Sequence, residues 1–269
     1  MTKPFISHHT LVRAALLCTL ILAANTMAPS GSHASEAGQM RDARRPLPFQ
    51  PGEKLRFLVR WSVIPAGEAI LEVLPPQVIN GRPCLHFVMT ARTYPFVDLF
   101  YKVRDRIESF TDLNMTYSLL YRKEQKGKSY KDVEVTLDWE KREARYSNHG
   151  RKRKPIPLIP GSFDPLSVFY AFRLLDLENR TELKTPVTDG KKCVMGKARV
   201  IGKERVHLPK KSYDTYLVIP ELKHVGGVFQ KSKDADLKIW VSADRRRIPV
   251  KIESKVAVGS FVAELHAER

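Results

Sequence analysis

Residues 54–74 read KLRFLVRWSVIPAGEAILEVL, and this stretch decides the fold. Residues 64–67 interrupt the pattern with a Pro/Gly turn, the run Glu68–Leu74 resumes it, and Pro75-Pro76 is expected to end it. Before the turn, large apolar residues occupy every second position: Leu55, Phe57, Val59, Trp61 and Val63. Two short alternating runs joined by a turn are typical of antiparallel β-strands with one buried face.

The same pattern continues along the chain. Asn80-Gly81 is the strongest hairpin signal, because both residues tolerate positive φ, and a strand is predicted after it over 84–93. Further strands are predicted over 99–110, 116–124, 133–139, 144–147, 192–195, 197–206, 215–219, 236–242, 249–256 and 259–265. No repeat or linker interrupts them, so we expect one domain over residues 51–266. The fold class is all-β and mainly antiparallel.

One helix is predicted, over residues 165–177. Asp164 is a good N-cap and Pro165 suits the first helical position. Apolar and aromatic residues follow at helical spacing, at Leu166, Phe169, Tyr170, Leu174 and Leu177. We expect this face to plug a curved sheet, with contact to lipid as the alternative.

Residues 1–34 have the pattern of a bacterial signal peptide. Lys3 and Arg13 flank the start, residues 14–24 are apolar, and Ser32-His33-Ala34 places small residues for cleavage between Ala34 and Ser35. The apolar run is too short to span a bilayer. We therefore predict a soluble protein exported to the periplasm, with no transmembrane segment after processing. Residues 35–50, polar and basic, are expected to form a flexible leader.

The predicted mature chain is strongly basic. It holds 44 Lys and Arg against 29 Asp and Glu, a formal charge of +15. In the cytosol such a charge would point to nucleic acid, but no nucleic-acid-binding motif is present and export places the chain elsewhere. Outside the cytosol the available polyanions are lipid headgroups and cell-surface polymers. A solvated basic surface without a dedicated partner is the alternative.

Motifs for catalysis or metal binding are absent from the sequence. It has no G-x-S-x-G, H-E-x-x-H, Walker A or G-x-G-x-x-G pattern, so we expect no enzyme, no catalytic residue, no metal and no cofactor. Two cysteines, Cys84 and Cys193, survive the predicted processing. An oxidising compartment permits a disulfide between them, although two free thiols are favoured.

Three segments resemble the exported bacterial proteins grouped as domain of unknown function 3108. They are residues 51–67 (PGEKLRF, then Trp61 and IPAG), residues 164–173 (DPLS, then Tyr170 and Arg173), and residues 240–261 (WVSAD, RIPVK and GSF). The resemblance implies a periplasmic β-protein whose sheet curves into a half-barrel, as in lipoprotein carriers of the LolA type or lipocalins. It carries over no catalytic residues.

Basic residues are the best candidates for a binding site. Lys102, Arg104 and Arg106 are expected on one strand face, and basic turns occur at 151–154 and 245–247. Together with Trp61 and Trp240 as an apolar wall, they would form a ligand site, although exposed strand faces and core tryptophans are ordinary alternatives. The leading hypothesis is a non-enzymatic protein that binds an anionic lipid or envelope glycolipid in a concave β-sheet. The alternative is a structural or adaptor protein with a packed core and an envelope protein partner.

Overall fold

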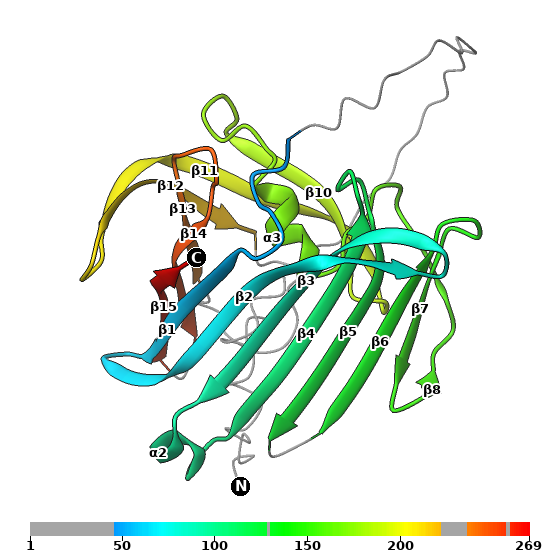
Figure 1. Cartoon of the computed structure of the whole chain (residues 1–269), viewed down its shortest axis with the longest axis horizontal. Coiled ribbons are helices and arrows are strands. Elements are labelled where there is room, and N and C mark those ends of the chain that lie inside the picture. The colour runs from blue at the N-terminus through cyan, green and yellow to red at the C-terminus, as the bar shows by residue number, and fades with distance from the viewer. Residues whose placement is uncertain (1–45, 128–129, 222–235, 257–258) are drawn as a thin grey trace, which may run out of the picture.

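The computed structural model describes residues 46–127, 130–221, 236–256 and 259–269. In this part of the chain the backbone forms one antiparallel sheet of fifteen strands that curls around a short helix (Figure 1). The strands are β1 (Lys54–Trp61), β2 (Ile64–Ile79), β3 (Arg82–Thr93), β4 (Val103–Asp112), β5 (Ser118–Gly127), β6 (Lys131–Asp138), β7 (Glu143–Asn148), β8 (Arg151–Lys152), β9 (Ile156–Pro157), β10 (Glu182–Thr188), β11 (Cys193–His207), β12 (Ser212–Pro220), β13 (Asp236–Ser242), β14 (Pro249–Val256) and β15 (Gly259–Glu268). The all-β antiparallel prediction is confirmed.

The sheet is a meander whose two halves join through the first and last strands. Its order runs β10-β11-β12-β13-β14-β15-β1-β2-β3-β4-β5-β6-β7-β8, with β9 on β7. In the joining pair, Phe57 lies opposite Leu265 and Trp61 opposite Phe261. Because each hairpin reverses the chain, alternate turns gather at the same end of the sheet. The turns therefore lie at two ends of the sheet, the end where β1 begins and the end where β1 finishes.

Alternation along each strand sends one set of side chains into the core. In β6, Val133, Val135 and Leu137 are buried, whereas the residues between them are partly exposed. The strand predicted at 133–139 is thereby confirmed with its buried face.

Helix α3 (Ser167–Phe172) fills the space inside the upper part of the sheet. Tyr170 is buried and stacks on Phe87 of β3, with ring centroids 4.0 Å apart. Phe49 meets both rings edge-on, at 5.4 Å from Phe87 and 5.2 Å from Tyr170. Stacked and edge-to-face aromatic pairs suit the ring quadrupole, so the helix is a core plug, as predicted from its aromatic face.

Segment 158–166 and the β10–β11 turn connect the two ends of the open sheet. Phe163 forms a parallel bridge with Val187 of β10, while Ser162 accepts a backbone hydrogen bond from Ser118 of β5. Gly190, at φ +78°, sits so close to β6 that an added Cβ would lie 2.7 Å from a Val135 methyl group. These contacts connect strands that lie far apart in the sheet order.

Several predicted boundaries were wrong. Pro75-Pro76 do not end β2, which continues to Ile79, because a register shift between Leu74 and Gln77 places both prolines in an irregularity that needs no ladder hydrogen bonds from them. The strand predicted from residue 99 begins at Val103, since residues 95–98 form the one-turn helix α2 (Pro95–Asp98). The helix predicted over 165–177 is regular only from Ser167 to Phe172.

The leader predicted over residues 35–50 is not flexible throughout. Phe49 is buried between Phe87 and Tyr170, so the chain is already packed before Pro51; residues 1–45, including the predicted signal peptide, lie outside the described residues. Strand β10 was not predicted.

Candidate anion-binding site

A cavity of about 930 Å³ opens at the end of the sheet where β1 begins and β15 finishes. Its walls come from residues 46–53, from the end of α3, from the β13–β14 turn and from the last residues of β15. Two carboxylates, Glu53 and Glu268, lie among its lining residues. The same lining contains five arginines: Arg173, Arg245, Arg246, Arg247 and Arg269. Positive charge therefore exceeds negative charge in this cavity.

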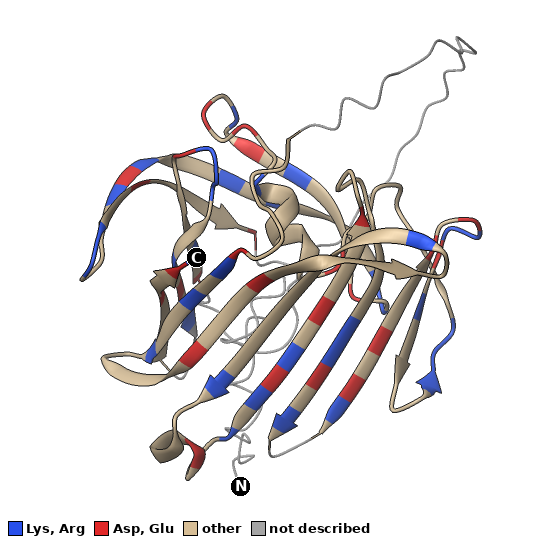
Figure 2. Ribbon diagram, in the orientation of Figure 1, with Lys and Arg blue, Asp and Glu red and all other residues tan. Residues whose placement is uncertain are grey.

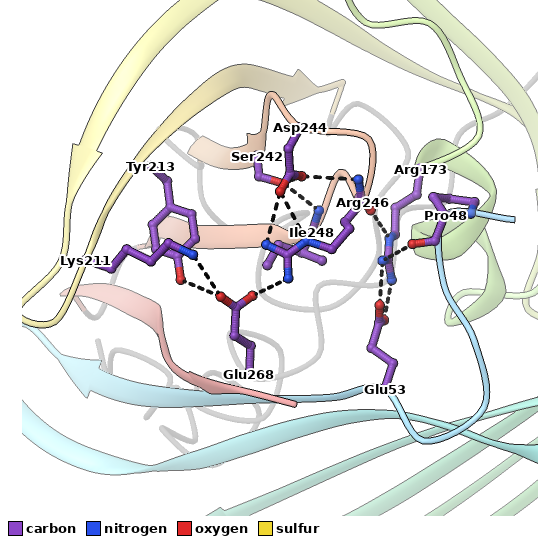
Figure 3. A network of polar contacts seen from close by, with 10 residues as sticks. All are labelled: Pro48, Glu53, Arg173, Lys211, Tyr213, Ser242, Asp244, Arg246, Ile248 and Glu268. Carbon is purple, nitrogen blue, oxygen red and sulfur yellow. Dashed lines mark hydrogen bonds and ion pairs between the residues drawn. The ribbon is translucent and has the colours of Figure 1, made fainter.

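Arg173 holds the cavity wall together (Figure 3). Its Nη1 and Nη2 donate to the two carboxylate oxygens of Glu53, at 2.6 and 2.8 Å. Nε donates to the carbonyl of Arg246 at 2.9 Å, and Nη2 also donates to the carbonyl of Pro48 at 3.1 Å. The guanidinium lies 5.1 Å from the ring centre of Phe49. Because its side chain is only 4 % exposed and its donors are occupied, Arg173 fixes three chain segments and is not available to a ligand.

Arg246 is held by two carboxylates, one from its own turn and one from the end of β15 (Figure 3). Its Nη1 donates to Glu268 Oε2 at 2.8 Å, and its Nη2 donates to Asp244 Oδ2 at 3.0 Å. Glu268 also accepts a hydrogen bond from Lys211 Nζ at 3.1 Å. Partial burial acts to raise the pKa of Glu268, but the hydrogen bonds from Lys211 and Arg246 and their charges outweigh it and hold this pKa below its usual value. Glu268 therefore stays ionised and orients Arg246.

The other three arginines donate few side-chain hydrogen bonds to the residues that the structure describes. The β13–β14 turn presents Arg245, which is exposed, and Arg247, whose φ of +46° is a left-handed turn conformation. Arg247 donates one hydrogen bond, from Nη1 to the carbonyl of Arg173 at 3.2 Å. Neither Arg245 nor Arg269 has an acidic partner in the described part of the chain. Guanidinium groups with free forks favour planar oxyanions such as carboxylate or phosphate.

An apolar recess of about 40 Å³ adjoins the cavity and shares Arg173 and Arg247 with it. Its other lining residues come from α3 and from β10 to β14, and they include Phe169, Leu183 and Ile239. The site is thus amphipathic, with a guanidinium-lined opening and a small apolar floor.

The residues predicted to bind an anion on one strand do not contribute to this cavity. Arg104 and Arg106 lie on the outer face of β4, where they pair with Asp98 and Glu108, each at 2.6 Å. Lys102 is exposed and precedes that strand. An open hollow of about 470 Å³ covers this face, and its arginines are largely neutralised by neighbouring carboxylates, as in the Arg92–Glu68 pair. Figure 2 shows these alternating blue and red bands on β4 to β6.

The two predicted wall tryptophans point to opposite faces. Trp61 pairs across the sheet with Phe261, Phe261 with Ser254, and Ser254 with Leu237, so these four side chains lie on one face. Trp240 follows Leu237 by three positions on β13 and pairs with Lys251. Side chains alternate between faces at each residue, so an odd separation puts the two rings on different sides. Trp240 is buried and donates from Nε1 to Glu204 at 2.6 Å, whereas Trp61 is 44 % exposed. They do not form one wall.

Sequence reasoning found part of the cavity and missed the rest. The basic turn at 245–247 was noted, but Arg173, which falls within the predicted helix and within a segment of the family resemblance, was given no role in a site. A charged residue on an apolar helix face signals a buried ion pair. Glu53, Glu268 and Arg269 carry no comparable local signal, because they reach the cavity through strand pairing between residues more than 200 positions apart.

Cys84 and Cys193 are both free. Cys84 is buried beside Phe110 and Leu120, while the Cys193 sulfur contacts the Ile159 N–H and the Ser162 hydroxyl, so the permitted disulfide does not form. Among the described residues, no cluster of three or more His, Cys, Asp or Glu side chains has the arrangement of a metal site. Over the same ranges, no helix combines the length and the apolar character that crossing a membrane requires.

The fold and site define an antiparallel β-sheet protein, curled around a helical plug, with a basic cavity at one end. The family model "Protein of unknown function (DUF3108)" matches residues 56–266, and the chain belongs to that family. No curated protein matches the chain. Among solved structures, the chain is similar to a β-barrel-like protein of domain of unknown function DUF1849 from Brucella abortus. The two share 10 % identity, with a TM-score of 0.50, over 80 % of this chain and 96 % of that one. At this identity the likeness concerns the fold alone.

Proposed function

We propose that this protein is a non-enzymatic binding protein of the bacterial cell envelope that holds an anionic lipid or glycolipid by its headgroup. The observation that carries the proposal is the unbalanced charge of the 930 Å³ cavity, with five arginines and two glutamates in its lining. Arg245, Arg247 and Arg269 would contact the phosphate or carboxylate of the headgroup. Arg173 and Arg246, fixed by Glu53 and Glu268, would keep the site in shape without a ligand.

This location differs from the concave sheet face expected from the sequence. Between α3 and the sheet, the described part of the inner face is packed with buried side chains that include Phe87 of β3 and Tyr170 and Val168 of α3. A ligand is therefore better accommodated beside the plug, at the end of the sheet. The apolar recess next to Arg247 would receive the first apolar atoms that follow the headgroup.

The proposed periplasmic localisation depends on residues 1–34, whose signal-peptide pattern argues for export. Cell fractionation followed by N-terminal sequencing tests it. We expect the protein in the periplasmic fraction with Ser35 as its first residue; a cytosolic protein that keeps residues 1–34 would contradict the assignment.

Calorimetric titration with dihexanoyl phosphatidic acid, a soluble lipid with a phosphate headgroup, tests the cavity. The variant Arg245→Glu/Arg269→Glu reverses two charges that have no acidic partner among the residues described, so we expect its affinity to fall at least about tenfold, or about 1.4 kcal/mol. The control Lys152→Glu/Lys154→Glu makes the same charge change at two exposed positions in and just after strand β8. Equal affinity in both variants would argue against the cavity.

An adaptor role is the second candidate, and the packed interior around Tyr170 is the observation that favours it. Crosslinking in cells would then trap one dominant protein partner, with or without lipid depletion. If the crosslink to this partner disappears in Arg245→Glu/Arg269→Glu, the partner contacts the cavity.

A further inference from the structure

Exposed apolar side chains gather at the end of the sheet opposite the arginine cavity. We call this set the apolar rim: Trp61, Val63, Ile64, Phe96, Leu99 and Phe100. Val63, Leu99 and Phe100 are more than 80 % exposed, at 86 %, 82 % and 83 %. A cluster of large apolar side chains that are this exposed to solvent is typical of a surface that contacts an apolar partner.

The rim comes from two neighbouring turns. Residues 62–63 join β1 to β2, and α2 lies between β3 and β4 at the lower edge of the sheet in Figure 1. The Tyr94 N–H donates to the carbonyl of Ala66 at 3.0 Å, which ties the start of the second turn to β2. The six side chains are therefore presented by connected backbone.

Local contacts hold Leu99 and Phe100 outward. On one side, Asp98 accepts from Arg104 Nη2 at 2.6 Å and from the Thr93 hydroxyl at 2.5 Å. On the other side, Tyr101 is buried and its N–H donates to the carbonyl of Val97 at 2.7 Å. With both neighbours anchored, the two residues between them cannot turn into the core.

Basic residues surround the rim. Lys102 precedes β4, Lys131 opens β6 and Arg151 opens β8, and the antiparallel pairing puts these three strand starts at this end of the sheet. Among the residues that the structure describes at this end, Asp98 pairs with Arg104, Glu124 with Lys126 and Asp236 with Lys238. This end is therefore both apolar at its tips and positively charged around them.

We propose that the apolar rim docks onto the surface of an anionic lipid bilayer. Aromatic and aliphatic tips would enter the interface between headgroups and acyl chains, while the lysines and Arg151 would contact the negative headgroups. Charge complementarity decides in favour of a membrane over a second copy of this chain, because two copies would bring the same positive charges together. The inference goes beyond headgroup binding and uses none of the cavity residues.

Vesicle co-sedimentation of the processed protein that begins at Ser35, purified from the periplasmic fraction, tests the proposal. We expect binding to phosphatidylcholine vesicles that contain phosphatidylglycerol and weaker binding to phosphatidylcholine alone. The variant Phe96→Ser/Leu99→Ser/Phe100→Ser should lower the partition coefficient at least about tenfold. The control Val78→Ser/Ile201→Ser removes exposed apolar side chains from elsewhere and should bind like the wild type.

Trp61 supplies a direct readout at the rim. Its emission should shift to the blue when anionic vesicles are added. The shift should be missing in Trp61→Phe, because Trp240 is buried and Trp139 follows the end of β6 that lies away from the rim. The proposal is overturned by equal binding of the rim variant and the wild type, by binding that ignores phosphatidylglycerol, or by a wild-type dimer that the rim variant converts to a monomer. None of these outcomes bears on the binding of a soluble phosphatidic acid at the cavity.

Discussion

Arg173 and Glu53 show how one residue pair connects the core to the site. The pair is bidentate and nearly buried, with side-chain exposures of 4 % and 12 %. It joins the end of α3 to the segment before β1, and the Pro48 and Arg246 carbonyls complete its hydrogen bonds. Removing one partner leaves an uncompensated buried charge, which costs more than replacing both by apolar groups.

The variant Glu53→Ala should lower the free energy of unfolding by about 3–5 kcal/mol, because Arg173 then stays buried without its carboxylate. The double variant Glu53→Leu/Arg173→Met should be more stable than Glu53→Ala. Urea denaturation of the three proteins measures this. A double variant that is less stable than Glu53→Ala would contradict the stated role of the pair.

At the scale of an element, Asp164 fixes the start of the plug helix. Its Oδ1 accepts the N–H groups of Leu166 and Ser167, at 2.8 and 3.0 Å. Its Oδ2 accepts the hydroxyls of Ser109, Ser118 and Ser167. The carboxylate thus satisfies the orphan donors of the first turn and attaches α3 to β4 and β5.

Substitution of Asp164 separates its hydrogen bonds from its charge. Asp164→Ala leaves several buried donors without an acceptor and should cost about 3 kcal/mol, whereas Asp164→Asn keeps an acceptor oxygen and should cost about 1 kcal/mol. Thermal and urea unfolding measure both variants, and equal losses would contradict the capping account.

The pH dependence of Asp164→Asn has a definite sign. Burial raises the pKa of Asp164, and the hydrogen bonds from Ser109, Ser167 and Ser118 offset it only in part. The folded protein therefore binds this proton more tightly than the unfolded chain does, so the group adds stability as pH falls through its folded pKa toward 3.8. As pH falls through that window, the stability of the wild type relative to Asp164→Asn should rise. Urea unfolding at a series of acidic pH values measures this difference, and a fall would contradict the assignment.

The sequence predicted much of this element and strand structure, and its failures share one cause. Local signals identified the buried face of β6 and the hairpin at Asn80-Gly81, and they singled out Asp164, whose carboxylate accepts N–H groups at the start of α3 although Leu166 is the N-cap residue. They could not show that Phe49 packs on Phe87, or that β2 passes Pro75-Pro76 through an irregularity, because both depend on partners brought close by the folded sheet. The cavity likewise joins Glu53 to Glu268 through the β1–β15 pairing.

At the scale of the whole molecule, closure of the curled sheet depends on Gly190. The β10–β11 turn approaches β6 and β7, where the space for a Cβ is occupied by Val135 and by the Tyr146 Cβ, 3.1 Å away. The turn also needs the left-handed φ of +78°. Conformation and packing both select glycine here.

Gly190→Ala should lower the free energy of unfolding by about 3 kcal/mol, from steric overlap together with backbone strain. Gly150→Ala is the matched control: φ is +73°, but no atom lies within 4 Å of the added Cβ, so only the strain of about 1 kcal/mol remains. Urea denaturation compares the two, and similar losses would show that the turn does not press against β6.

The central claim is that the arginine cavity holds an anionic headgroup. Native mass spectrometry of the protein purified from the envelope of its own cells tests this most directly. We predict an adduct with the mass of an anionic lipid or glycolipid on the wild type and on Lys152→Glu/Lys154→Glu, and its loss from Arg245→Glu/Arg269→Glu. A wild-type protein that carries no adduct, or an adduct that persists when the two cavity arginines are reversed, would contradict the claim.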